Sequence, residues 1–288
     1  MRSLHPALLA LHGVLLLGAC DGGCVPGEWS SGALLYPHRR PVPSSPPPGA
    51  RSIELAGDGV TLRGWSYAAK GTRRGALVYL HGVGDNRASS TGVATTFTRH
   101  GFDVLAYDSR AHGESDGQYC TYGYHERRDL RAVVSSLPEG PVILLGSSLG
   151  ASVALQAAPE IPRVRGVAAI APFSDLRTIA EDRAPAVMGA ADIEAGLRHA
   201  EQTAGFDVDV VSAARAAARI TVPVLLVHGA DDTDTPPAHS RRIHAALAGP
   251  KELILVRGVG HNQALGADIW RRIERFIIRA AARRGGEP

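Results

Sequence analysis

The sequence predicts an α/β protein in which helices flank a mostly parallel central sheet, and two observations lead to this fold class. Apolar runs of strand length alternate with helix-length segments from about residue 52 to residue 282. This alternation is typical of parallel strands joined by crossover helices. Only the first two strand-like runs are separated by Gly57-Asp58-Gly59, a hairpin signal. One edge of the sheet should therefore be antiparallel.

The elements follow from apolar runs and from the turn residues between them. The predicted strands cover residues 52–56, 61–67, 76–81, 102–107, 142–145, 164–171, 221–228 and 252–256. The predicted helices cover residues 88–100, 122–137, the small-residue run after Gly150, and 269–282. Ligand sites in such sheets lie beyond the carboxyl ends of the strands.

The stretch at residues 177–207 is less regular than its surroundings and predicts a small cap over the carboxyl ends of the strands. Its apolar side chains, with one just before it, are expected either to form the core of the cap or to line an acyl pocket. They are Leu176, Ile179, Met188, Ile193, Leu197 and Phe206. The domain as a whole is predicted to span residues 51–288.

Composition narrows the function. A net charge of +3 over 288 residues, with scattered basic side chains, does not predict a nucleic-acid partner. The chain has no Cys/His cluster with zinc spacing and no glycine-rich phosphate loop, so no metal and no cofactor is expected. The composition leaves the oligomeric state open.

The first nineteen residues have the layout of a secretory signal peptide. A basic start, Met1-Arg2, precedes a short apolar run at residues 7–19. The run ends in Leu17-Gly18-Ala19-Cys20, which resembles the lipobox of bacterial lipoproteins. That resemblance implies lipid on Cys20 and an exported protein anchored to a membrane on the periplasmic or outer face. The alternative is an ordinary signal peptide cut near Ala19, which would leave a soluble periplasmic or secreted protein.

Residues 20–50 are rich in Gly, Pro and Ser and show no periodic apolar face. We predict a tether here rather than a folded element. In an exported protein Cys24 and Cys120 could form a disulfide, which the sequence alone does not establish.

The segment from Pro141 to Leu155 has the pattern of a nucleophile elbow. A strand-like run turns sharply at Gly146-Ser147-Ser148-Leu149-Gly150 and continues as a helix, which is the context that G-x-S-x-G requires. Small residues at 146 and 150 would let neighbouring backbones approach closely. We therefore expect Ser148 to be a nucleophile at a helix N-terminus.

A serine nucleophile needs a base, and His261 in Gly258-Val259-Gly260-His261-Asn262 is the best candidate. It follows the last predicted strand. Of the other histidines, His81 and His112 are expected to keep the shape of nearby loops, and His228 to be structural. Five more are expected to be solvated on helices or helix ends: His100, His125, His199, His239 and His244.

The base needs a carboxylate, and several acids compete for this role. We choose Asp232, which lies three residues after Gly229, over Asp231 and Asp234 in the same loop. Asp175, beyond the preceding strand, is the runner-up.

With these residues in the order serine, acid, histidine, the stretch from about residue 52 to 282 resembles the α/β-hydrolase superfamily. The likeness is to its dienelactone-hydrolase-like and acyl-peptidase-like branches. Four segments carry it besides the elbow: His81-Gly82-Val83-Gly84-Asp85-Asn86, Tyr107-Asp108-Ser109-Arg110-Ala111-His112-Gly113-Glu114-Ser115, Val227-His228-Gly229-Ala230-Asp231-Asp232 and the glycines around His261. Ala111 departs from the family, which commonly has glycine there.

The resemblance implies an oxyanion hole formed by the backbone N–H groups of Val83 and Leu149. It also implies a serine hydrolase that cleaves small-molecule carboxylic esters through an acyl-enzyme, with Ser148, Asp232 and His261 as the triad. A thioesterase, an acyltransferase or a peptidase would use the same three residues. The alternative of another class is a catalytically inactive binding lipoprotein on a hydrolase scaffold.

Overall fold

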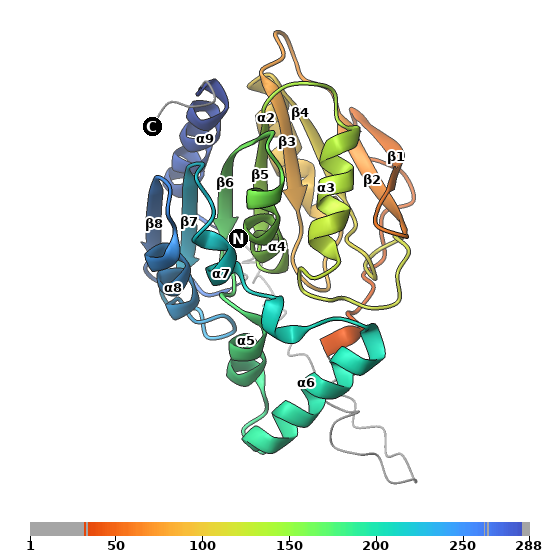
Figure 1. Ribbon diagram of the computed structural model, residues 1–288. Helices are drawn as coiled ribbons and strands as arrows, with labels where there is room; N and C mark the ends of the chain where they lie inside the picture. Colours follow the sequence, from red (N-terminus) through yellow and green to blue (C-terminus); the bar gives the residue numbers. More distant parts are fainter. Residues whose placement is uncertain (1–31, 33, 262, 264, 284–288) are drawn as a thin grey trace, which may run out of the picture.

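The computed structural model describes residues 32, 34–261, 263 and 265–283, and in them one eight-stranded sheet carries helices on both faces (Figure 1). The strand order is β1-β2-β4-β3-β5-β6-β7-β8. β2 is antiparallel to both β1 and β4, and every other pair is parallel. The strands are β1 (Ala50–Ala56), β2 (Thr61–Tyr67), β3 (Gly75–Leu80), β4 (Phe102–Tyr107), β5 (Val142–Ser147), β6 (Val164–Ile170), β7 (Val224–Gly229) and β8 (Lys251–Val256). The predicted fold class and antiparallel edge are confirmed.

Two layers of helices cover the sheet. α2 and α9 pack on one face, and α3, α4, α7 and α8 pack on the other. α5 and α6 lie beyond one end of the sheet (Figure 1). The helices are α2 (Thr91–Arg99), α3 (Glu126–Ser136), α4 (Leu149–Ala157), α5 (Leu176–Arg183), α6 (Ala190–Ala204), α7 (Ala213–Ala217), α8 (Ala238–Ala246) and α9 (Ala267–Ala282), with short 3-10 turns η1 (Arg87–Ser90), η2 (Ala158–Glu160) and η3 (Val208–Val210).

Strand periodicity divides the apolar side chains between two cores. Leu77 and Tyr79 of β3 point to the core under α2 and α9, whereas Val78 and Leu80 point to the core under α3 and α4. Successive side chains of a strand face opposite sides of the sheet. A central strand with helices on both faces must therefore be apolar throughout, and β3 is buried along its whole length.

α3 begins four residues later than the sequence predicts. Tyr122 and Gly123 have positive φ angles of 55° and 124°, which lie outside the right-handed helical region. The Glu126 carboxylate accepts hydrogen bonds from the backbone N–H groups of Thr121 and Gly123 at 2.7 Å each. These bonds hold the preceding residues as a turn.

Residues 34–50, called the N-terminal strap below, pack against the domain instead of standing apart from it. Leu35 is fully buried in the core. Its carbonyl accepts a hydrogen bond from Cys120 N at 2.9 Å, and the Tyr122 hydroxyl donates to Leu34 O at 3.1 Å. The prediction of a free tether therefore does not hold for these residues.

The strap continues toward the carboxyl ends of the parallel strands. Arg39 donates to three backbone carbonyls of the loop at residues 113–117. Arg40 forms an ion pair with Asp85 at 3.1 Å, and the Asn86 amide donates to the carbonyls of Arg40 and the next residue at 3.0 and 3.2 Å. The strap thus contacts the turn that follows β3.

The predicted leader at residues 1–19, with Cys20 and Cys24, lies outside the described residues. Cys120, which could pair with Cys24, is buried and forms no disulfide within the described residues, and burial raises the pKa of its thiol well above the usual value. None of the described helices is long and apolar enough to span a bilayer.

Candidate active site

Ser148 occupies a strained turn between β5 and α4. Its φ and ψ angles are 50° and −114°, a conformation that non-glycine residues rarely adopt and that occurs at functional sites. A Cβ on Gly146 would lie 2.4 Å from the backbone of Gly150, and one on Gly150 would lie 2.3 Å from Leu80 O. Both positions must therefore be glycine, as the elbow pattern predicts.

The structure brings Ser148, Asp232 and His261 together from three separate loops. His261 Nε2 lies 3.0 Å from Ser148 Oγ, and His261 Nδ1 lies 2.7 Å from Asp232 Oδ2. An ionised carboxylate only accepts hydrogen bonds, so Nδ1 carries the ring proton and donates it to Asp232. Nε2 is then unprotonated and can accept the hydroxyl proton of Ser148.

Asp232 is held by four donors. Its Oδ1 accepts from the backbone N–H groups of Asp234 and Thr235 at 3.0 and 2.8 Å, and its Oδ2 faces His261 and also His228 Nε2, at 3.2 Å. Burial acts to raise the pKa of Asp232. The hydrogen bonds from His228, His261 and Thr235 outweigh burial and hold that pKa well below its usual range. The carboxylate is therefore ionised at neutral pH.

His228 takes a larger part in the site than the sequence indicates. Ser240 Oγ lies 2.7 Å from His228 Nδ1, and the Thr235 carbonyl lies 2.7 Å from Nε2. The carbonyl can only accept, so Nε2 carries the proton and is shared between Thr235 O and Asp232. The sequence carries no signal for this contact beyond the position of His228 at the end of β7.

The competing acids have other roles. Asp175 caps α5 by accepting from Thr178 N at 2.9 Å. Burial acts to raise the pKa of Asp175, but hydrogen bonds from Thr178 and Ser174 lower it below its usual value. Asp234 lines the pocket in front of Ser148 and is not hydrogen-bonded to His261. Asp231 follows the strand end but is exposed.

Val83 and Leu149, the expected oxyanion donors, lie on two sides of Ser148. Leu149 is the first residue of α4, and the N–H groups of a first helical turn have no acceptor within the helix. Val83 lines the pocket, and its N–H is not hydrogen-bonded within the described residues. A Cβ on Gly82 would lie 3.5 Å from Ser148 Cβ, so the turn after β3 passes directly beside the nucleophile.

His81 and His112 support this turn from behind. His81 Nδ1 donates to Gly82 O at 2.7 Å, and its Nε2 accepts from Ser109 N at 2.9 Å. The two imidazole rings meet edge to face, 5.1 Å apart. Burial, followed by the nearby His81, lowers the pKa of His112 to about 4. Both rings are neutral and structural, in agreement with their predicted role.

The prediction that His239 is solvated is wrong. The side chain is fully buried, its Nδ1 accepts from Ser174 N at 3.0 Å, and its Nε2 lies 2.9 Å from Asp182 Oδ2. Because Nδ1 accepts, Nε2 carries the proton and donates to Asp182. His239 thereby attaches the C-terminal end of α5 to α8. Burial and the nearby Arg242 lower its pKa.

A cavity of about 730 Å³ opens in front of Ser148 and His261. Four segments form its wall: the N-terminal strap, the turn after β3, the end of α5 and the loop that carries Asp232. The predicted cap is present as α5 and α6, but only the end of α5 reaches the cavity.

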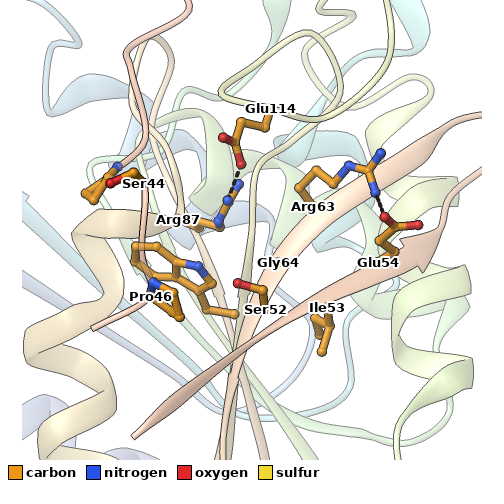
Figure 2. A pocket seen from close by; sticks show the side chains of 11 residues that line it. Ser44, Pro46, Ser52, Ile53, Glu54, Arg63, Gly64, Arg87 and Glu114 are labelled. Atoms are coloured by element: carbon orange, nitrogen blue, oxygen red, sulfur yellow. Dashed lines mark hydrogen bonds and ion pairs between the residues drawn. The ribbon is translucent and has the colours of Figure 1, made fainter. Parts of the chain in front are cut away.

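A second cavity, of about 360 Å³, lies between the strap and the β1–β2 hairpin (Figure 2). Its charged side chains form two ion pairs, Arg87 with Glu114 and Arg63 with Glu54. Its lining contains no nucleophile next to a base, so we assign the active site to the cavity at Ser148. The described residues contain no group of side chains that could hold a metal ion.

Comparisons with known proteins place the chain in a family. Residues 75–206 match the model of the alpha/beta hydrolase fold. The uncharacterised protein YqkD of Bacillus subtilis is 31% identical over 218 residues, which cover 70% of each chain. This chain therefore belongs to the alpha/beta hydrolase fold family, and the resemblance of its motifs to the α/β-hydrolase superfamily is confirmed.

Two further likenesses cover more of the chain. An uncharacterised protein of Mycobacterium tuberculosis (strain H37Rv) is 28% identical over 265 residues, 88% of each chain. The esterase Pf2001 of Pyrococcus furiosus has a similar fold, with a TM-score of 0.65 at 20% identity over 84% of this chain and 97% of that one. These likenesses extend the shared fold well beyond the residues that the family model matches.

Proposed function

We propose that this protein is a serine hydrolase that cleaves carboxylic esters through an acyl-enzyme intermediate. The observation that carries the proposal is the hydrogen-bonded chain from Ser148 through His261 to Asp232, at 3.0 and 2.7 Å. A hydroxyl beside an unprotonated imidazole nitrogen, oriented by a buried carboxylate, is the arrangement that activates serine.

In this mechanism Ser148 Oγ attacks the ester carbonyl carbon while its proton passes to His261 Nε2. The C–O bond to the alcohol then breaks, and the alcohol leaves with that proton. A water molecule, deprotonated by His261, then attacks the acyl-enzyme. The bond from the acyl carbon to Ser148 Oγ breaks, Oγ takes up the proton from His261, and the carboxylic acid is released. Asp232 stabilises the imidazolium formed in each half-reaction. The N–H groups of Val83 and Leu149 receive the negative charge on the carbonyl oxygen, and each such donor contributes about 3 kcal/mol to transition-state stabilisation.

A fluorophosphonate probe tests the proposal because it reacts only with an activated serine. We expect stoichiometric labelling of the wild-type protein at Ser148, no labelling of Ser148→Ala, and little labelling of His261→Ala. Hydrolysis of p-nitrophenyl acetate should be lost in parallel.

Two results would contradict the proposal. Labelling that persists in Ser148→Ala would place the nucleophile elsewhere. A folded wild-type protein that neither reacts with the probe nor turns over esters, thioesters or aminoacyl anilides would favour a binding protein on a hydrolase scaffold.

A further inference from the structure

The wall of the cavity in front of Ser148 is more polar than the walls of small-molecule pockets ordinarily are. Its charged side chains come from all four wall segments: Arg40, Asp85, Asp182, Arg183 and Asp234. Val83 supplies the one apolar side chain larger than a methyl group among the lining residues described. Small-molecule pockets are ordinarily lined mostly by apolar and aromatic side chains.

We propose that the active site takes small hydrophilic esters, neutral or cationic, and discriminates against both fatty-acyl and anionic ones. This inference rests on the proposed function and narrows its substrate class. The cavity volume of about 730 Å³ is ample for a medium-length acyl chain. Selection must therefore come from the chemistry of the wall rather than from its size.

The charges of the wall do not cancel. Two arginines face three aspartates, so the formal charge of these side chains is −1. Arg40 and Asp85 neutralise each other, and Asp182 accepts a hydrogen bond from His239. Arg183 donates to the backbone carbonyl of Asp234 at 2.9 Å and to a hydroxyl.

Asp234 is the carboxylate of this wall that has neither a cation nor a hydrogen-bond donor within the described residues. Its backbone N–H donates to Asp232, but its side chain forms no ion pair or hydrogen bond within the described residues. A positively charged or hydrogen-bond-donating substrate group would find a partner there. An alkyl chain or a carboxylate would instead displace water from the Asp234 carboxylate without supplying a hydrogen-bond donor or a cation in its place. This loss of hydration is unfavourable.

Five of the six apolar side chains that the sequence offered for a fatty chain are engaged elsewhere, and the sixth, Met188, does not line the cavity. Leu176, Ile179, Leu197 and Phe206 are buried in the main core, and Ile193 packs against it. None of these residues lines the cavity. Of the two roles open from the sequence, these five therefore belong to the core.

The test is a series of p-nitrophenyl esters with one leaving group. An apolar acyl pocket would raise kcat/KM by about fourfold for each added methylene. We expect kcat/KM to fall from acetate through butyrate to octanoate instead. Among six-carbon acyl groups, the 6-trimethylammonio ester should exceed mono-p-nitrophenyl adipate by at least about fivefold. A rise with chain length, or a preference for the adipate ester, would overturn the inference.

Variants of the residues in the cavity wall test whether these side chains cause the substrate preference. Asp234→Leu should raise the octanoate-to-acetate ratio of kcat/KM by about fivefold and abolish the preference for the cationic ester. Glu139→Leu, the same kind of change on an exposed residue before β5, should leave both ratios unaltered. If Asp234→Leu does not fold, Arg40→Leu replaces it in the test, because it should also raise the octanoate-to-acetate ratio of kcat/KM. Unchanged ratios in a folded Asp234→Leu or Arg40→Leu protein would reject the wall as the cause.

The outcomes separate this inference from the function on which it rests. Fluorophosphonate labelling of Ser148 depends on the serine and histidine and not on acyl preference. A protein that is labelled and prefers octanoate disproves the hydrophilic substrate class alone. A protein that is not labelled disproves the proposed hydrolase and the substrate class together.

Discussion

Asp232 owes its assignment to its surroundings rather than to its place in the sequence. Three acids occupy one short loop, and only Asp232 contacts His261. Its second oxygen is held by two backbone N–H groups, which fixes the direction of the carboxylate. His228 adds a further contact from the end of β7. The orientation of His261 thus depends on the Asp232 carboxylate, in which every acceptor position is occupied by a donor.

We expect Asp232→Asn to lower kcat for p-nitrophenyl acetate by about 10³- to 10⁴-fold. An amide can donate to His261 Nδ1 and so favour the wrong imidazole tautomer, with the proton on the nitrogen that faces Ser148. Steady-state kinetics at pH 7.5 measure this loss. Asp175→Asn and Asp234→Asn are matched controls and should each retain more than about a tenth of the wild-type kcat. Near-native turnover of Asp232→Asn would show that another acid performs this role.

The residues of the site differed in how far the sequence could predict them. Ser148 and His261 each lie beside glycines that form a local turn, and such a turn can be recognised in the sequence. Their proximity to each other and to Asp232 was therefore predictable. His228 and His239 carry no such signal, since the partners of an imidazole are set by which loops meet in space. The same holds for Arg40, which reaches the cavity from the strap, and for Asp182 and Arg183, which reach it from the end of α5.

At the scale of elements, the N-terminal strap is where sequence reasoning fell short. Its Pro and Ser content does exclude regular structure, and among residues 36–49 no helix or strand forms. Absence of periodicity is not absence of packing, however. A single buried leucine, Leu35, and the side chains of Arg39 and Asn86 hold the strap through contacts that need no repeating pattern.

We predict that the strap supports the turn that carries Val83. Asn86→Ala, which removes the donor to the carbonyls of Arg40 and Pro41, should lower kcat about tenfold with little change in KM, because a displaced oxyanion donor weakens transition-state binding. The measurement is kcat and KM for p-nitrophenyl acetate.

Two further variants sharpen this prediction. Asn86→Asp keeps the oxygen that accepts from Ala88 N but lacks the donor, so its kcat should fall as in Asn86→Ala. Full activity of Asn86→Asp would attribute the effect to the capping of η1 instead. Arg39→Ala loosens the strap at the loop of residues 113–117 and should retain at least half of kcat.

At the scale of the whole molecule, the fold was largely predictable because most of its strands are buried on both faces. Such strands appear as apolar runs between turn residues, and β4 has the predicted bounds. β2, in which partly buried polar residues alternate with buried ones, also has its predicted bounds. The deviations occur where side chains decide the backbone. At the start of α3 the Glu126 carboxylate holds a turn with positive φ angles, and no apolar pattern reports such a contact.

The buried histidines should make the folded protein sensitive to mild acid. Burial lowers the pKa values of His81 and His239 and brings that of His112 to about 4. Below about pH 6.5 these histidines bind protons in the unfolded chain but not in the folded protein. The stability of the folded protein therefore falls as the pH falls toward 4. For His112 alone, the loss between pH 7.5 and pH 5 should be about 2 kcal/mol.

Urea unfolding of the wild type and of His112→Phe at both pH values checks this. The variant removes a ring whose Nε2 is buried without a partner in the described part of the chain, at the cost of one hydrogen bond to Arg110 O. We expect the stability of the variant at pH 7.5 to lie within about 1 kcal/mol of the wild type. Its loss on going to pH 5 should be smaller by about 2 kcal/mol, and an equal loss in both proteins would contradict the assignment.

The positive φ angle of Ser148 also sets a conflict for anyone who would engineer this protein. The backbone conformation of Ser148 is strained, and glycine would adopt it without the steric penalty that a side chain incurs. Selection for thermal stability alone would thus favour loss of the nucleophile, and the most stable variants of such a screen would be catalytically inactive. Durability and turnover compete at this single position, so a search for robust variants has to score both.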